Sequence, residues 1–191
     1  MLSLPDAALV QREPNLPGIA TLLDPDAFLA ALQRALPHLD LRGGQITYVK
    51  YKPGTSLLAA YQVQVATAPL WLYAIAYAEE EVEKVRKAAR AQDVRTAIGP
   101  GGVVLEALAL VIYAFPNDRK LTALHDLAVA PKQMRLLQKL APDTPALWHG
   151  QWIDLRYKPE RRYVVRIQGS DQQALLKFYT PLDYANACRS A

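Results

Sequence analysis

The chain has 191 residues, enough for one domain or two small ones, and 51% of them are hydrophobic, which is ordinary for a globular protein with a sizeable core. Its 22 lysines and arginines outnumber 18 aspartates and glutamates, so the formal net charge is +4. These cations are dispersed along the sequence, whereas nucleic-acid-binding proteins concentrate them, so the composition argues against nucleic acid as a partner.

The first 23 residues contain several prolines and no clear hydrophobic period, which predicts an irregular arm with at most a short turn of helix. Asp24 and Pro25 then mark the start of a helix, because aspartate caps free backbone amides and proline fits the first turn. The helix is expected to run to about Leu36, with one apolar stripe formed by Phe28, Leu29, Leu32 and Leu36.

A sheet module follows the glycine pair at 43–44. Residues 46–51 and 57–65 read as strands joined by a turn at 52–55, since apolar and polar residues alternate in the second of them. Residues 70–77 are predicted to return as a third strand. A charged helix is then expected at 79–91.

Glycine-rich residues 99–102 break the chain before two further predicted strands at 103–106 and 108–115. Asp118 comes next, after Pro116 and Asn117, and in that context a turn or helix cap is a more common role than a metal ligand. Short helices are expected at 121–127 and 132–140.

From about Trp152 the first module is repeated. Residues 155–167 read as a hairpin, residues 174–179 as a third strand and residues 183–190 as the start of a helix. Tyr51-Lys52-Pro53 corresponds to Tyr157-Lys158-Pro159, and Tyr77 to Tyr179. The prediction is an α+β protein with antiparallel sheets and packed helices, in two parts: a complete module at 1–145 and a truncated one at 146–191.

These segments resemble the N-lobe of the aminoglycoside phosphotransferase family, in the kinase-like superfamily. Residues 156–163 resemble that family's first hairpin, and residues 175–179 its third strand, where a lysine holds the phosphates of ATP. Residues 103–119 similarly resemble the later strands of such a lobe, in the first copy. The resemblance implies ATP and Mg2+ as cofactors and makes Lys177 the phosphate contact.

The first copy departs from the family pattern, because it has Ile75 where the lysine is expected, so it is predicted to be a cap-like, non-catalytic lobe. The catalytic aspartate and the magnesium-binding aspartate of the family lie in a C-lobe that these residues do not include. We therefore expect no phosphoryl transfer by this chain alone and assign no catalytic residue and no metal ligand.

Three residues are candidate nucleotide contacts: Lys177, Arg161 and Arg162. Lysine and arginine both suit phosphate oxygens. Since adjacent strand residues face opposite ways, only one of the two arginines can share a face with Lys177. The alternatives are an edge-strand lysine that points to solvent and a solvated hairpin tip stabilised by Glu160.

A second hypothesis is a non-enzymatic binding or regulatory module. An incomplete sheet leaves an open edge that can pair with a partner chain or form a homodimer. A weaker third hypothesis is polyanion binding, which the basic composition allows. The single cysteine, Cys188, fits a reducing cytoplasm, and no apolar run reaches the roughly 18 residues that a membrane helix needs.

Overall fold

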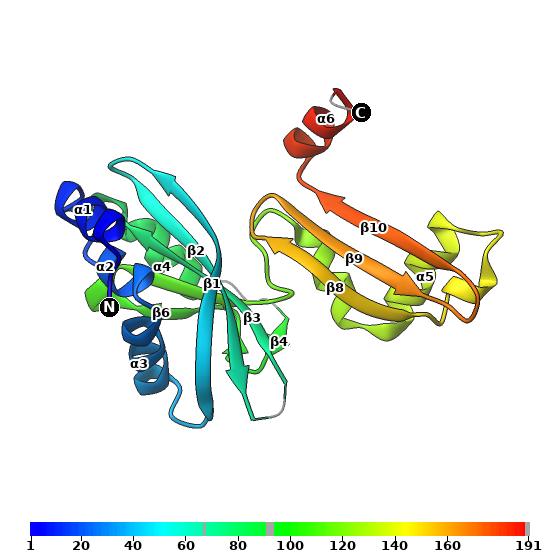
Figure 1. Ribbon diagram of the computed structural model, residues 1–191, viewed down its shortest axis with the longest axis horizontal. Helices are drawn as coiled ribbons and strands as arrows, with labels where there is room; N and C mark the ends of the chain where they lie inside the picture. The colour runs from blue at the N-terminus through cyan, green and yellow to red at the C-terminus, as the bar shows by residue number, and fades with distance from the viewer. Residues whose placement is uncertain (67, 91–93, 190–191) are drawn as a thin grey trace. The chain divides into compact units, whose positions relative to one another are not determined.

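The computed structural model describes residues 1–66, 68–90 and 94–189, and the chain divides into two compact units, Met1–Phe115 and Pro116–Ala191 (Figure 1). The α+β prediction is confirmed, since helices pack against antiparallel sheets in the structure. The boundary expected after residue 145 lies inside the second unit. Within the described ranges, no helix is both long enough and apolar enough to cross a membrane.

The N-terminal unit is a five-stranded antiparallel sheet in the order β1-β2-β3-β7-β6, with a separate short ribbon β4-β5. Its strands are β1 (Leu41–Lys52), β2 (Ser56–Val65), β3 (Leu70–Tyr77), β4 (Arg95–Thr96), β5 (Gly99–Pro100), β6 (Val103–Leu105) and β7 (Leu110–Ala114). Its helices are α1 (Leu4–Arg12), α2 (Ile19–Leu23), α3 (Pro25–Ala35) and α4 (Val82–Arg90), with single 3-10 turns η1 (Glu79–Glu81) and η2 (Glu106–Leu108).

The arm before Asp24 is more helical than the single short turn predicted there, because α1 and α2 occupy most of it. Ser3 caps α1 by accepting a hydrogen bond from the amide of Asp6, and a proline lies in the first turn. The predicted helix start at Asp24 is confirmed: its Oδ1 accepts from the amides of Asp26 at 3.1 Å and Ala27 at 3.4 Å.

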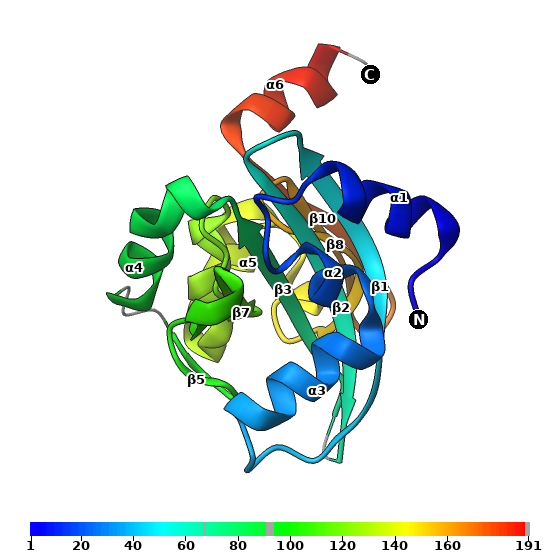
Figure 2. The same cartoon turned by 90° about the vertical axis from the view of Figure 1, so that its left-hand side faces the viewer.

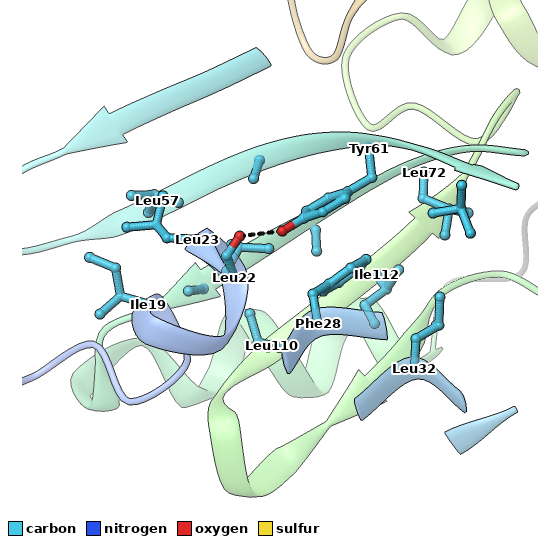
Figure 3. Packing of buried hydrophobic residues seen from close by; sticks show 14 of the residues in the cluster. Ile19, Leu22, Leu23, Phe28, Leu32, Leu57, Tyr61, Leu72, Leu110 and Ile112 are labelled. Carbon is cyan, nitrogen blue, oxygen red and sulfur yellow. Dashed lines mark hydrogen bonds between the residues drawn. The ribbon is translucent and has the colours of Figure 1, made fainter. Parts of the chain in front are cut away.

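Helices α2 and α3 lie against the sheet (Figure 2) and bury its apolar face. At the centre, the rings of Phe28 and Tyr61 stack with their centroids 4.1 Å apart. The Tyr61 hydroxyl donates to the carbonyl of Leu22 at 2.7 Å (Figure 3), which satisfies a polar group that the core otherwise excludes from water. Burial raises the pKa of Tyr61 well above its usual value.

The C-terminal unit is a three-stranded antiparallel sheet in the order β10-β9-β8. Helices precede it and one helix follows it. Its elements are η3 (Thr122–Ala128), α5 (Ala130–Leu140), η4 (Pro145–Leu147), β8 (Gln151–Lys158), β9 (Arg162–Gln168), β10 (Gln173–Tyr179) and α6 (Pro181–Arg189).

The two units contain the same hairpin, between β1 and β2 and between β8 and β9. In each, the third turn residue has a positive φ, 63° at Gly54 and 59° at Glu160. The fourth residue of each turn donates its amide to the lysine carbonyl that opens the turn, at 3.1 Å from Thr55 to Lys52 and 3.1 Å from Arg161 to Lys158. The sequence repeat of Tyr-Lys-Pro therefore corresponds to one backbone geometry used twice.

The correspondence extends upstream of the predicted repeat. Helices α3 and α5 each have 11 residues, and both end in the same way: the amide of Leu36 bonds the carbonyl of Leu32, and the amide of Ala141 that of Leu137, at 2.8 Å each. The leading segments keep buried apolar residues at matched spacing. The matched pairs are Leu16 and Leu121, Ile19 and Leu124, Leu22 and Leu127, and Leu32 and Leu137.

Candidate functional site

The net positive charge of the chain comes from its C-terminal unit. Residues 116–191 hold twelve lysines and arginines against seven aspartates and glutamates, whereas residues 1–115 hold ten against eleven. The net charge is therefore +5 in one unit and −1 in the other, a bias that the sum over the whole chain conceals.

Strand register gathers five of these cations on one face of the β8-β9-β10 sheet. Residues opposite one another in antiparallel strands share a face. Arg162 lies between Lys158 and Tyr179, Val164 between Arg156 and Lys177, and Arg166 between Ile153 and Leu175. We call this surface the basic face; its cations are Arg156, Lys158, Arg162, Arg166 and Lys177.

The structure brings two of the three predicted site residues to this face. Lys177 is exposed. Arg162 is on the same side of the sheet, in the next row toward the turn, since it lies two residues before Val164, the partner of Lys177. Arg161 lies in the turn, and its Nε and Nη2 donate to Oδ1 of Asp183 at 3.1 and 3.0 Å. Arg162 is thus the arginine that shares a face with Lys177, while Arg161 connects the hairpin to α6.

A pocket of about 320 Å³ opens at the turn end of the basic face. Lys158, Arg161 and Arg162 line it from the hairpin, and Tyr179, Asp183 and Asn186 from β10 and α6. Burial lowers the pKa of the Lys158 ammonium below its usual value, and the like charges of Arg156, Arg162 and Arg161 add to this effect.

Two arginines of the basic face have an unsatisfied nitrogen. Nε of Arg162 and Nε of Arg166 are buried and have no hydrogen-bond acceptor among the residues that the structure describes. A buried donor without an acceptor is unfavourable, and it is more so on a charged group. An anion that reached these guanidinium groups would relieve both the missing bonds and the mutual repulsion.

The opposite face of the same sheet has a different chemistry. Tyr157, Tyr163 and Phe178 lie there in one cross-strand row, and Val165 and Ile167 are fully buried. The hydroxyl of Tyr163 donates to Oδ1 of Asp154, so this carboxylate is turned away from the cations. The two faces therefore separate the apolar core from the charged surface.

The hairpin turn beside the pocket is fixed by Asp118, which is 1% exposed. Its Oδ1 accepts from the amides of Lys120 and Leu121, both at 2.8 Å, so the predicted turn or cap role is confirmed. Its Oδ2 accepts from the Tyr157 hydroxyl at 2.8 Å and the amide of Glu160 at 2.9 Å. The sequence did not indicate this second role.

The carboxylate of Glu160 lies 3.2 Å from Nζ of Lys120 and 3.7 Å from Nη1 of Arg119. The hairpin tip is therefore not simply solvated, as the alternative interpretation proposed, because Glu160 is buried and paired with cations that precede the sheet.

We call a carboxylate that accepts from both the tyrosine and the turn amide of its hairpin, as Asp118 does, a carboxylate clamp. The N-terminal unit has an equivalent carboxylate clamp but not the full basic face. Glu13 accepts from the Tyr51 hydroxyl and from the amide of Gly54, as Asp118 does from Tyr157 and Glu160. At the positions that match the basic face, however, the register places Ser56, Ala60 and Ile75 in the positions of Arg162, Arg166 and Lys177. By the same register, Lys52 and Lys50 match Lys158 and Arg156, so the first strand keeps its two cations in both units. The cations of the second and third strands occur in the C-terminal unit only.

A larger, mainly apolar pocket of about 460 Å³ lies between α3 and η2, but it offers only Arg34 and Glu106 as charged groups. No group of three or more histidine, cysteine, aspartate or glutamate side chains within the described part of the chain is arranged to hold a metal ion.

Comparison of the chain with protein-family models, with curated proteins and with solved structures found no match.

Proposed function

We propose that this chain is the N-terminal portion of an ATP-dependent small-molecule kinase that resembles the aminoglycoside phosphotransferases, with the nucleotide phosphates bound on the basic face. The observation that carries the proposal is the convergence of Lys177 and Arg162 with three more cations on one open sheet face. Phosphoryl-transfer proteins depend on such charge neutralisation, because the transferred group is strongly anionic.

The order of elements supports the same proposal. Each unit has three consecutive antiparallel strands followed by a helix. After its helix the N-terminal unit adds the ribbon β4-β5 and two more strands of its main sheet, β6 and β7, the later strands that the resemblance implies. In this proposal the N-terminal unit, with Ile75 in place of the lysine, is a non-catalytic cap. The catalytic aspartate and the acceptor site belong to a C-lobe, and the single cysteine suits the ATP-containing cytoplasm.

The test is calorimetric titration of ATP into the full chain and into single-residue variants. Lys177→Ala and Arg162→Ala are each expected to weaken binding about fivefold, the contribution of one exposed ion pair. Lys139→Ala is the matched control, because Lys139 is an exposed cation of α5 that lies outside the basic face, and it should bind as the parent chain does.

Equal weakening in all three variants would indicate diffuse charge attraction instead of a site. The absence of ATP binding by the parent chain at millimolar concentration would refute the proposed function.

One observation favours the second hypothesis, a binding module without enzymatic activity. β10 is an edge strand of its sheet, whereas its counterpart β3 is paired with β2 on one side and β7 on the other. Leu175 of β10 is 58% exposed, and Leu182 of α6 is 73% exposed. A partner strand could cover this edge. Light scattering at micromolar concentration tests the homodimer: a monomer under all conditions would refute it.

A further inference from the structure

We infer that the basic face binds a phosphate chain free of Mg2+, an inference that rests on the phosphate-binding role proposed above. The family resemblance implies Mg2+ together with ATP. Mg2+ in such sites is held by one or two protein carboxylates as well as by phosphate oxygens. The magnesium-binding aspartate of the family lies in its C-lobe, so the question for this chain is whether its own basic face offers a carboxylate as well.

The face itself offers cations, hydroxyls, amides and apolar groups. By register, the three rows nearest the turn contain Lys158, Arg162 and Tyr179, then Arg156, Val164 and Lys177, then Ile153, Arg166 and Leu175. The fourth row holds Gln151, Gln168 and Gln173. No aspartate or glutamate occurs in these rows of the described sheet.

The nearest candidate carboxylate is Asp183, which lines the pocket from α6. Both of its oxygens are already engaged. Oδ1 accepts from Nε and Nη2 of Arg161, and Oδ2 accepts from the Thr180 hydroxyl at 2.7 Å. The guanidinium of Arg161 is already bound to this carboxylate, and its positive charge would repel a divalent cation there.

The other carboxylates close to the hairpin are also committed elsewhere. Asp154 accepts from Tyr163 on the opposite face, and Glu160 is paired with Lys120 and Arg119. Asp118 accepts four hydrogen bonds from its surroundings. The donor set at the basic face therefore fits phosphate oxygens and does not fit Mg2+.

Guanidinium groups and Mg2+ compete for the same phosphate oxygens. Each arginine presents a planar fork that can bond two of these oxygens, and the unsatisfied Nε atoms of Arg162 and Arg166 need acceptors. Mg2+ bound to a triphosphate removes two negative charges and occupies some of those oxygens. The fully charged chain should therefore bind the face more tightly than its Mg2+ complex.

The experiment titrates the full chain by calorimetry with ATP, once with a chelator and once with saturating Mg2+, at matched ionic strength. We expect the Mg2+ complex to bind about five to ten times more weakly, since two of the charges that meet exposed cations are neutralised. Inorganic tripolyphosphate without metal should bind at least as tightly as ATP. It isolates the phosphate chain from the base and sugar.

Two variants distinguish the inference from its alternative. Asp183→Asn should bind metal-free ATP as tightly as the parent chain or more tightly, because it removes a negative charge beside the pocket. Arg166→Gln should weaken metal-free ATP binding, while the control Lys139→Gln should not.

Binding that requires Mg2+, or that Mg2+ strengthens, would overturn the inference and leave the proposed nucleotide site standing, and its loss in Asp183→Asn would assign the metal to that carboxylate. Failure of both ATP and tripolyphosphate to bind under either condition would overturn the proposed function as well.

Discussion

Replacement of Asp118 tests how the hairpin beside the basic face is held in place. Asp118→Ala removes the acceptor of four hydrogen bonds, two of which come from the buried Tyr157 hydroxyl and the Glu160 amide. Loss of the bonds from these buried donors costs about 1–3 kcal/mol, and loss of the turn bonds from the amides of Lys120 and Leu121 costs about 1 kcal/mol more. We expect the free energy of unfolding of the C-terminal unit to fall by about 4 kcal/mol.

Two milder variants divide this loss. Asp118→Asn keeps an oxygen for the amides of Lys120 and Leu121 but turns an NH2 group toward the Glu160 amide, so about 2 kcal/mol should be lost. Tyr157→Phe removes a single hydrogen bond from the cluster and should cost about 1 kcal/mol. The expected order of destabilisation is alanine, then asparagine, then phenylalanine.

Urea denaturation followed by tryptophan fluorescence measures these changes. In a Trp71→Phe background the remaining tryptophans, Trp148 and Trp152, both belong to the C-terminal unit. Asp143→Ala is the control, because Asp143 is exposed, and it should change stability by less than about 0.5 kcal/mol. A similarly small effect of Asp118→Ala would refute the conclusion that Asp118 holds the hairpin in place.

Three other changes probe the remaining framework. Tyr61→Phe should lower the stability of the N-terminal unit by about 1 kcal/mol, because the bond to the Leu22 carbonyl is lost; Trp71 fluorescence in a background without the other tryptophans reports it. Gly54→Ala should cost about 1–2 kcal/mol in the same assay, since φ at this turn is positive; an unchanged urea midpoint would contradict the left-handed turn. Burial raises the pKa values of Tyr61 and Tyr163, so the stability that these neutral phenols provide is complete below their ordinary value of 10.0 and is lost as pH rises above it. The tyrosinate absorbance of these two residues should therefore appear only as each unit unfolds, and ionisation of all ten tyrosines in the folded protein would contradict this.

Local sequence patterns predicted the strands and the hairpins well, because alternation and turn residues act over a few positions. Residues 57–65 and 70–77 form β2 and β3 nearly as expected. The helices before Asp24 were missed because α2 has only five residues and shows too little of a period to be recognised. Its buried residues become apparent only when the sheet lies against them.

The site depends on contacts that sequence proximity does not show. Asp118 and Tyr157 are 39 residues apart, and the bond between their side chains needs both the turn at Lys120 and the turn at Glu160. The basic face likewise depends on register: a shift of one residue between β9 and β10 would move Lys177 to the apolar side, away from Arg162. The cations looked dispersed because they come from three strands.

The comparison between the two units indicates what the cations of the basic face are for. Both units have the same hairpin and the same carboxylate clamp, yet Ala60 and Ile75 are buried in one unit where Arg166 and Lys177 stand in the other. The framework therefore folds without positive charge at these positions. Five like charges on one face repel each other. Burial lowers the pKa of Lys158, and the charges of Arg156, Arg162 and Arg161 lower it further. An arrangement that the framework does not need and that opposes its stability is best explained by a ligand of opposite charge.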